Sequence, residues 1–249
     1  MGDLNSELFW AVHRDLPREG PGDTAATLRA FRMMPDLPPD PTILDVGCGP
    51  GAQTVTLAQA SRGRLIAVDT HRLFLDDLVG RAKWAGVSQR VHPARMSMFN
   101  LGFSQGFDVV WSEGAIYIMG FEEGLRAWRA FLKPGGYAAV TEVSWLKPDP
   151  APDAVAFWAE AYPKMASVEG NLSRVRRAGY RPIGHFTLPQ SAWWGVYFTP
   201  MLARIAELRD AYRGNPEAQA ILDEEAAETD LYRQHADDYG YVFYVMQME

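Results

Sequence analysis

Apolar residues recur at two different spacings along the chain. Near the N-terminus, Leu4, Leu8 and Val12 stand at four-residue spacing, which predicts a short amphipathic helix. The segment Leu16–Asp23 follows and is too rich in proline and glycine to form a helix or a strand. A second helix is expected over Ala25–Met33. From residue 42 onward, apolar runs of strand length alternate with helical stretches.

This alternation predicts a parallel, doubly wound, Rossmann-like α/β sheet with helices on both faces. The expected strands are Thr42–Val46, Arg64–Val68, Arg90–Ala94, Asp108–Ser112, Tyr137–Ser144, Ile183–Leu188 and Tyr241–Met248. The expected helices are Ala52–Ser61, Leu73–Trp84, Glu122–Leu132, Ala151–Tyr162, Asn171–Ala178, Pro200–Arg213 and Pro216–Gln234. The helical pair before the last strand is large enough to cover the carboxyl edge of the sheet as a cap.

Composition and charge narrow the classes of function. The 249 residues are 47% hydrophobic and 12% aromatic, which supports a full core and excludes global disorder. A net charge of −7 argues against a nucleic-acid partner, because counterion release requires a basic face. The single cysteine, Cys48, excludes an intrachain disulfide, and the five histidines lack the paired spacing of a metal site. With no signal peptide and no apolar run of about 20 residues, we expect a soluble cytoplasmic protein without a membrane partner.

The sharpest chemical signal is a glycine loop between a predicted strand and a predicted helix. It reads Asp45-x-Gly47-x-Gly49-x-Gly51, and its glycines let the backbone approach a ligand at the helix N-terminus. Asp69 ends the next strand, 20 positions after Gly49, where a carboxylate can hold the ribose hydroxyls of an adenosine-type cofactor.

Two cofactors fit this loop. The spacing Gly47-x-Gly49-x-x-Ala52 satisfies the dinucleotide fingerprint, whereas Asp45 with the glycines satisfies the S-adenosylmethionine version. The carboxylate of Asp45 favours the second, because at the mouth of the loop it would repel a pyrophosphate and suit a cationic amino acid group. A tight turn that holds no ligand is the remaining interpretation.

The motifs and their order resemble the class I S-adenosylmethionine-dependent methyltransferases. The residues that carry this resemblance are Asp45–Gly51, Asp69, Phe107–Val110 and Leu132–Tyr137. Three further segments, Leu16–Gly22, Trp111–Tyr117 and Tyr239–Tyr241, resemble a bacterial group of small methyltransferases with a type 11/25-like domain. The resemblance implies a mostly parallel sheet of about seven strands with an antiparallel last strand. It also implies a single domain over 1–249, with a lid at 1–40, a cofactor core at 41–145 and a C-terminal half at 146–249 whose cap lies at about 189–236.

The resemblance further implies a pocket for S-adenosyl-L-methionine and its product S-adenosyl-L-homocysteine. The expected cofactor-binding residues are Arg18, Asp45, Gly47, Cys48, Gly49, Gln53, Asp69, Thr70, Ser97, Met98, Trp111 and Glu113. Many relatives carry an acid for the adenine amino group in the segment 96–101. This chain has Ser97, Met98 and Phe99 there, which puts that direct hydrogen bond in doubt.

Three residues are candidates for catalysis. Glu113 follows the fourth core strand and would orient the acceptor or accept its proton; the alternative is a loop carboxylate bound to backbone amides. His13 lies near the proposed lid and is the histidine to test as a base. Tyr117, with Trp111 and Trp145, is expected to face the pocket, because all three follow core strands.

The proline- and glycine-rich loop Leu16–Gly22 is expected to close over the ligand as a lid. Within it, the guanidinium of Arg18 could clamp the carboxylate of the cofactor or of an acidic substrate. An exposed loop arginine is the plainer alternative.

The sequence thus predicts in-line methyl transfer from S-adenosylmethionine to a small-molecule acceptor, with no metal. One alternative is an NAD(P)-dependent oxidoreductase, although no Tyr-x-x-x-Lys pair is present. A second alternative is a non-catalytic member of the fold that binds cofactor. A homodimer through the cap helices stays open.

Overall fold

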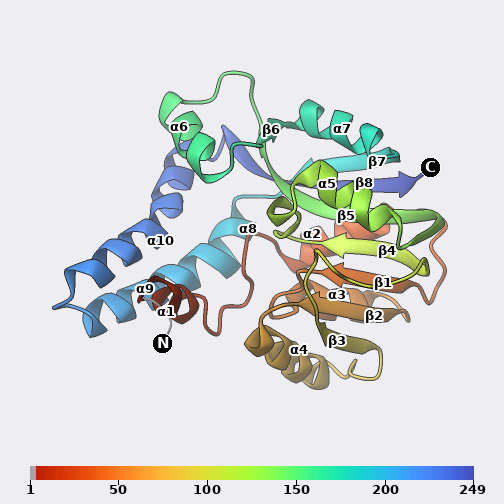
Figure 1. The fold of residues 1–249 in the computed structure, drawn as a ribbon, viewed down its shortest axis with the longest axis horizontal. Helices are drawn as coiled ribbons and strands as arrows, with labels where there is room; N and C mark the ends of the chain where they lie inside the picture. Colours follow the sequence, from red (N-terminus) through yellow and green to blue (C-terminus); the bar gives the residue numbers. More distant parts are fainter. Residues whose placement is uncertain (1–3) are drawn as a thin grey trace.

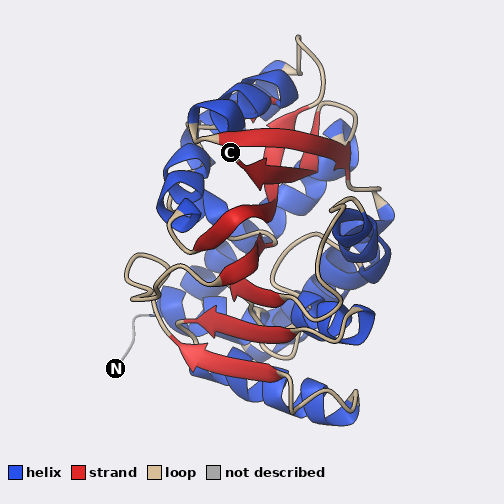
Figure 2. Ribbon diagram, turned by 90° about the vertical axis from the view of Figure 1, so that its right-hand side faces the viewer, coloured by secondary structure: helices blue, strands red, loops and turns tan. Residues whose placement is uncertain are grey.

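The computed structural model describes residues 4–249, and its centre is one twisted sheet with helices on both sides (Figures 1 and 2). The strands are β1 (Thr42–Val46), β2 (Arg64–Asp69), β3 (Val91–Arg95), β4 (Phe107–Ser112), β5 (Leu132–Trp145), β6 (Ala166–Ser167), β7 (Tyr180–Thr187) and β8 (Tyr239–Met248). They form an 8-stranded sheet in the order β3-β2-β1-β4-β5-β8-β7, with β6 paired to β5. All pairs are parallel except those that β8 makes with β5 and β7. The predicted fold class is confirmed.

Two groups of helices cover the sheet, and a third group stands beyond its end. The helices are α1 (Leu4–Val12), α2 (Thr24–Arg32), α3 (Ala52–Ala60), α4 (Arg72–Trp84), α5 (Phe121–Arg129), α6 (Pro152–Ala161), α7 (Val168–Arg177), α8 (Ser191–Trp193), α9 (Thr199–Ala211) and α10 (Pro216–His235), with short helical turns η1 (Ile116–Ile118) and η2 (Trp194–Phe198). Side chains of α2, α3 and α4 pack on one face, and those of α5 and α7 pack on the other. Helices α1, α6, α9 and α10 share a separate apolar cluster and extend past the sheet (Figure 1).

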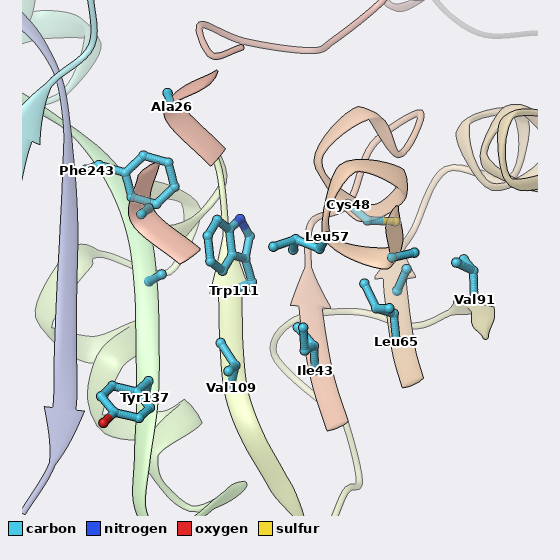
Figure 3. Close-up of a cluster of buried hydrophobic side chains, with 14 of the residues drawn as sticks. Ala26, Ile43, Cys48, Leu57, Leu65, Val91, Val109, Trp111, Tyr137 and Phe243 are labelled. Carbon is cyan, nitrogen blue, oxygen red and sulfur yellow. The ribbon is translucent and has the colours of Figure 1, made fainter. Parts of the chain in front are cut away.

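Strand β1 shows why the central strands read as continuous apolar runs. Successive side chains of a strand point to opposite faces. Ile43 therefore joins the cluster under α3, with Val109 of β4 (Figure 3). Leu44 joins the cluster on the opposite face. Because helices or loops cover both faces, Ile43 and Leu44 are both fully buried.

Several predicted boundaries shift by a few residues, and the largest shift lies between α5 and β5. The helix expected over Glu122–Leu132 ends at Arg129, and Leu132 already belongs to β5. Leu132 pairs with Phe107 of β4, and the register then shifts before Val109. Gly135 and Gly136 lie within the strand, where this irregularity accommodates them. The strand β6, the short helix α8 and the turns η1 and η2 were not predicted.

The division into lid, core and cap stays a prediction, and residues 1–3 of the expected lid lie outside the described residues. The segment between α1 and α2 runs from the cap back to the sheet (Figure 1). It therefore connects the end of the molecule where α9 and α10 lie with the face that α2 covers.

The glycine loop is pressed against α4. Gly51 has φ of 84°, a backbone conformation that residues with a Cβ rarely adopt. A Cβ at this position would lie 2.2 Å from Cδ1 of Leu78, one of the buried residues of α4. Glycine is thus required here both for the backbone conformation and for the packing of α3 beside α4.

Replacing Gly51 by alanine should lower the free energy of unfolding by about 2 kcal/mol or more, from backbone strain and overpacking together. Urea denaturation monitored by circular dichroism would measure it. Gly80→Ala is the matched control, because Gly80 lies inside α4 and a Cβ added there would have no atom within 4 Å. There we expect a gain of about 0.5–1 kcal/mol. Equal effects of the two substitutions would contradict the packing argument.

Candidate functional site

A cavity of about 510 Å³ opens where the parallel strands end, between the sheet and the cap. The glycine loop after β1, the end of β2, the segment after β3 and the turn after β4 all contribute to its wall. Predicted site residues that line it are His13, Arg18, Gly47, Cys48, Gly49, Gln53, Asp69, Thr70, Ser97, Met98, Glu113 and Tyr117. The structure therefore brings together most of the residues that the sequence singled out, and a volume of this size is typical of sites for cofactors.

Asp69 lies at the end of β2 and fixes the glycine loop. Its Oδ2 accepts a hydrogen bond from the backbone N–H of Gly49 at 3.0 Å, and its Oδ1 accepts one from the N–H of His71 at 2.8 Å. Both oxygens are thereby oriented at the cavity wall. Each carboxylate oxygen retains a further lone pair, so Asp69 can still accept hydrogen bonds from a ligand.

The predicted position of Asp45 at the mouth of the loop is wrong. Asp45 is fully buried beneath the loop and does not line the cavity. Its Oδ2 accepts a hydrogen bond from Oγ1 of Thr54 at 2.5 Å, and Nε2 of Gln53 lies 3.5 Å from its Oδ1. Burial raises the pKa of Asp45 to about 7, although both hydrogen bonds oppose the rise. Asp45 thus supports α3 and the loop from below, and Gln53 is the residue of this group that reaches the cavity.

Glu113 is a buried carboxylate with three donors around it. Arg18 donates to Oε2, Oγ1 of Thr27 donates to Oε1 at 2.8 Å, and Nε1 of Trp111 donates to Oε1 at 2.9 Å. All three donors are side chains, so the predicted alternative of a loop carboxylate bound to backbone amides is wrong. A direct role of Glu113 toward the acceptor stays a prediction. Glu113 lines the cavity chiefly as the partner of Arg18.

Arg18 is buried rather than exposed, so the plainer alternative for this residue is wrong. Its guanidinium pairs with Glu113 and lines the cavity. The rest of the loop is also tied down. Arg81 of α4 donates to the carbonyl oxygens of Leu16 at 3.0 Å and Pro17 at 2.7 Å. Residues 18–21 of this loop line the cavity, and closure of the loop over a ligand stays a prediction.

His13 is placed between two carboxylates. Its Nδ1 lies 2.6 Å from Oε2 of Glu19 in the lid, and its Nε2 lies 3.7 Å from Oε2 of Glu225 in α10. Burial lowers the pKa of His13, but the hydrogen bonds and charges of the two carboxylates outweigh it and raise the pKa to about 9. His13 is therefore protonated at neutral pH and is not poised as a base, which corrects the prediction. We call these three residues the lid latch.

Two of the three predicted aromatic residues do not face the cavity. Trp111 is fully buried in the core, where its ring packs edge-on against Phe243 at a centroid distance of 5.4 Å (Figure 3). Only its indole N–H reaches the site, through Glu113. Trp145, at the end of β5, packs against Tyr239 at the start of β8 and does not line the cavity. Tyr117 does line it, as predicted.

Several lining residues were missed from the sequence. Phe9 and Trp10 of α1 contribute to the wall, and Trp10 stacks on His71 at a centroid distance of 3.8 Å. Tyr197 and Glu225 come from the cap. Phe9 and Trp10 are apolar residues on a different side of α1 from Leu8. Their presence could have shown that this side of the helix also packs against another part of the protein. No local signal marks Glu225, because α10 carries acidic residues along much of its length.

The segment after β3 borders the cavity as predicted, through Met96, Ser97, Met98 and Phe99. None of these side chains is acidic, so the missing adenine acid is not replaced from within this segment. Among residues 4–249, no group of three or more His, Cys, Asp or Glu is arranged to hold a metal ion. No helix in this part of the chain has both the length and the apolar character needed to cross a membrane.

Comparisons with known proteins identify the core. Residues 43–136 match the family model described as "Methyltransferase domain". The structure is similar to YjhP from E. coli, with a TM-score of 0.83 and 21% identity over 98% of this chain and 100% of that one. It is also similar to a SAM-dependent methyltransferase from Thiobacillus denitrificans in complex with S-adenosyl-L-homocysteine, with a TM-score of 0.84 and 20% identity over 97% and 98%.

A curated relative matches only a short part of this chain. The tRNA U34 carboxymethyltransferase of Shewanella woodyi is 31% identical over 88 residues, which are 34% of this chain. The match spans only 27% of that enzyme's length. This relative therefore supports a shared segment and not a shared whole protein.

The lid latch should make stability depend on pH. The pKa of His13 is raised in the folded state, so the lid latch contributes its full stabilisation of the folded protein below the unfolded pKa of 6.5. This stabilisation is lost as the pH rises through about 9. We expect the wild-type melting temperature to fall over that interval more steeply than that of His13→Gln. Thermal unfolding at several pH values would measure the difference, with His185→Gln, at an exposed position of β7, as the control that follows the wild type. Parallel curves for His13→Gln and wild type would contradict the latch.

The Arg18–Glu113 pair should be strongly coupled. Glu113→Ala leaves the Arg18 guanidinium buried without its carboxylate, which we expect to cost about 3–5 kcal/mol of unfolding free energy. The double variant Arg18→Ala/Glu113→Ala should cost clearly less than the two single variants added together. Urea denaturation would measure this cycle. The same cycle on the exposed pair Arg72 and Asp76 of α4 should give a coupling close to zero. Additive effects at Arg18 and Glu113 would show that the two residues do not act as a unit.

Proposed function

We propose that this chain, which belongs to the class I S-adenosylmethionine-dependent methyltransferases, transfers a methyl group from S-adenosylmethionine to a small-molecule acceptor. The family and cofactor predicted from the motifs agree with the matched domain at 43–136 and with the S-adenosyl-L-homocysteine in a similar structure. One observation carries the proposal. The glycine loop and Asp69 are held together by a hydrogen bond at the wall of a cavity large enough for this cofactor.

The residues at the cavity fit the cofactor. Gly47 has φ of 70°, and a Cβ there would lie 2.4 Å from that of Ala115, so glycine is needed for the loop to pack against the turn after β4 at the cavity wall. Asp69 would bind the ribose hydroxyls. Glu19 offers a partner for the ammonium group, because its Oε1 is buried and has no hydrogen-bond partner among the described residues. Met98 would pack against the adenine ring.

Methyl transfer from a sulfonium requires alignment and exclusion of water more than acid–base chemistry. The cofactor supplies an activated methyl group on a positively charged sulfur. Around it, the lid residues Arg18 and Glu19 close the cavity, and the ring of Tyr117 offers an electron-rich face to a cation. The protein's task at this point is therefore positioning, and Glu113 contributes by holding Arg18 in place.

A small acceptor is favoured over RNA on two grounds. The site lies beneath the lid and the cap, and the protein carries a net charge of −7. The tRNA-modifying relative matches about a third of this chain, so the features that bind its tRNA need not be present. The titration below tests the oxidoreductase alternative. A non-catalytic protein would also bind S-adenosylmethionine, so that alternative is tested by transfer of a methyl group to an acceptor. The cytoplasmic location and the homodimer stay predictions.

Calorimetric titration with S-adenosylmethionine, S-adenosylhomocysteine and NAD would test the proposal directly. We expect micromolar binding of the first two and none of NAD. Asp69→Ala should weaken binding at least tenfold, because it removes the ribose acceptor and releases the loop from Gly49. Asp76→Ala, an exposed carboxylate on α4, is the matched control and should bind as the wild type does. Binding of NAD alone would replace this proposal by the oxidoreductase.

A further inference from the structure

A second cavity, of about 160 Å³, adjoins the first on the side of the cap. Both cavities are lined by Glu19, Gly20, Pro21, Gly114, Tyr117 and Tyr197. The two spaces therefore meet at the lid and at the turn after β4. We call the second one the acceptor chamber. Its volume is close to that of an engineered cavity that holds a benzene ring.

The walls of the acceptor chamber are mostly aromatic. Tyr117, Tyr162, Tyr197, Tyr241 and Trp158 all line it. Tyr117 and Tyr162 meet edge to face at a centroid distance of 6.0 Å, so their rings form a corner. Such walls suit a molecule with an apolar body, and their ring faces attract a cation.

The tyrosine hydroxyl groups in the chamber differ in their hydrogen bonding. Tyr162 donates to Oε1 of Glu142 at 2.6 Å and therefore presents its ring rather than its hydroxyl. The hydroxyls of Tyr117, Tyr197 and Tyr241 make no hydrogen bond within residues 4–249. They are available to a ligand.

Glu228 of α10 supplies the only carboxylate of the chamber wall, within the described residues, that has no partner. It makes no hydrogen bond or ion pair within residues 4–249, whereas the other lining carboxylate, Glu19, is bound to His13. Burial raises the pKa of Glu228 to about 7. The pKa of Tyr117 is raised first by its own burial and second by the negative charge of Glu228. Glu228 is thus a half-buried carboxylate that lines the chamber together with the aromatic walls.

The charges of the chamber select the acceptor. No lysine, arginine or histidine is among its lining residues within the described chain. An acidic acceptor would find two glutamates and no cation, whereas an ammonium group would find a carboxylate without a partner and several ring faces. This balance contrasts with the cofactor cavity, where Arg18 and His13 contribute positive charge.

We propose that the acceptor is a small amine with an apolar body, held in this chamber with its nitrogen against Glu228 and directed at the opening into the cofactor cavity. This inference rests on the proposed methyltransferase function and narrows its substrate class. Glu228 takes one proton from the bound ammonium group, which frees the nitrogen lone pair. The lone pair forms the N–CH₃ bond as the S–CH₃ bond breaks, and the electron pair of that bond stays on sulfur. The methylated ammonium leaves, and Glu228 returns its proton to solvent.

A panel of matched ligands tests the inference on the full chain saturated with S-adenosylhomocysteine. Benzylamine, benzyl alcohol and benzoate share one ring and differ in the polar group, and benzyltrimethylammonium carries a permanent positive charge. Calorimetry should show benzylamine and benzyltrimethylammonium binding at least tenfold more tightly than the alcohol and the acid. With S-adenosylmethionine, mass spectrometry should show a methyl group added to benzylamine.

Glu228→Gln keeps the shape of the side chain and removes its charge. We expect it to reduce the affinity for benzylamine and benzyltrimethylammonium at least tenfold, while the affinity for S-adenosylhomocysteine stays within twofold of wild type. Glu224→Gln is the matched control, because Glu224 is exposed one turn earlier on α10. It should leave every affinity unchanged.

The outcomes separate the inference from the function on which it rests. If the wild type binds S-adenosylhomocysteine but prefers benzyl alcohol or benzoate to benzylamine, the amine assignment is overturned and the proposed methyltransferase stands. Unchanged amine affinity in Glu228→Gln would overturn the role of that residue. If the wild type binds neither S-adenosylmethionine nor S-adenosylhomocysteine, both proposals fail together.

Discussion

A positive charge buried under a loop must be paired, and in this protein the pairing of Arg18 with Glu113 defines the site. The turn after β4 supplies the carboxylate, and the lid supplies the guanidinium. Because Glu113 also binds Thr27 of α2 and Trp111 of β4, the lid is fixed to the sheet and to a helix on its face at once. The position of the lid determines where the cofactor cavity ends. The acceptor chamber begins at the same place, since Glu19, next to Arg18, lines both.

The two cavities are formed by different parts of the chain. The cofactor cavity is formed largely by loops at the ends of the parallel strands, where open α/β sheets bind their ligands. The acceptor chamber takes Tyr162, Tyr197 and Glu228 from the end of α6, the turn η2 and α10, all outside the segment 43–136 that matches the family model. The proposed acceptor chamber thus depends on residues that the family model does not include. A shared fold alone could not reveal the acceptor.

The sequence could predict the glycine loop and Asp69, because strand, loop, helix and acid follow one another within a short stretch. Asp45 and Trp111 were placed wrongly although the same stretch contains the information. Asp45 lies two positions from Ile43, and Trp111 two positions from Val109, so each shares the face that packs under the helices. The role of His13 could not be predicted, because its raised pKa depends on the contacts of its ring with Glu19 and with Glu225. Both contacts form only after folding, and Glu225 is far away in the sequence. The same holds for Glu228, whose helix carries many similar acids.

Glu225 and Glu228 stand three positions apart on α10, nearly one helical turn, and face two different cavities. One holds the lid latch and the other lines the acceptor chamber. Because both carboxylates belong to one 20-residue helix, their positions are fixed relative to each other, and any displacement of α10 would move the partner of His13 and the wall of the acceptor chamber together. The lid latch and the acceptor chamber therefore share one structural support.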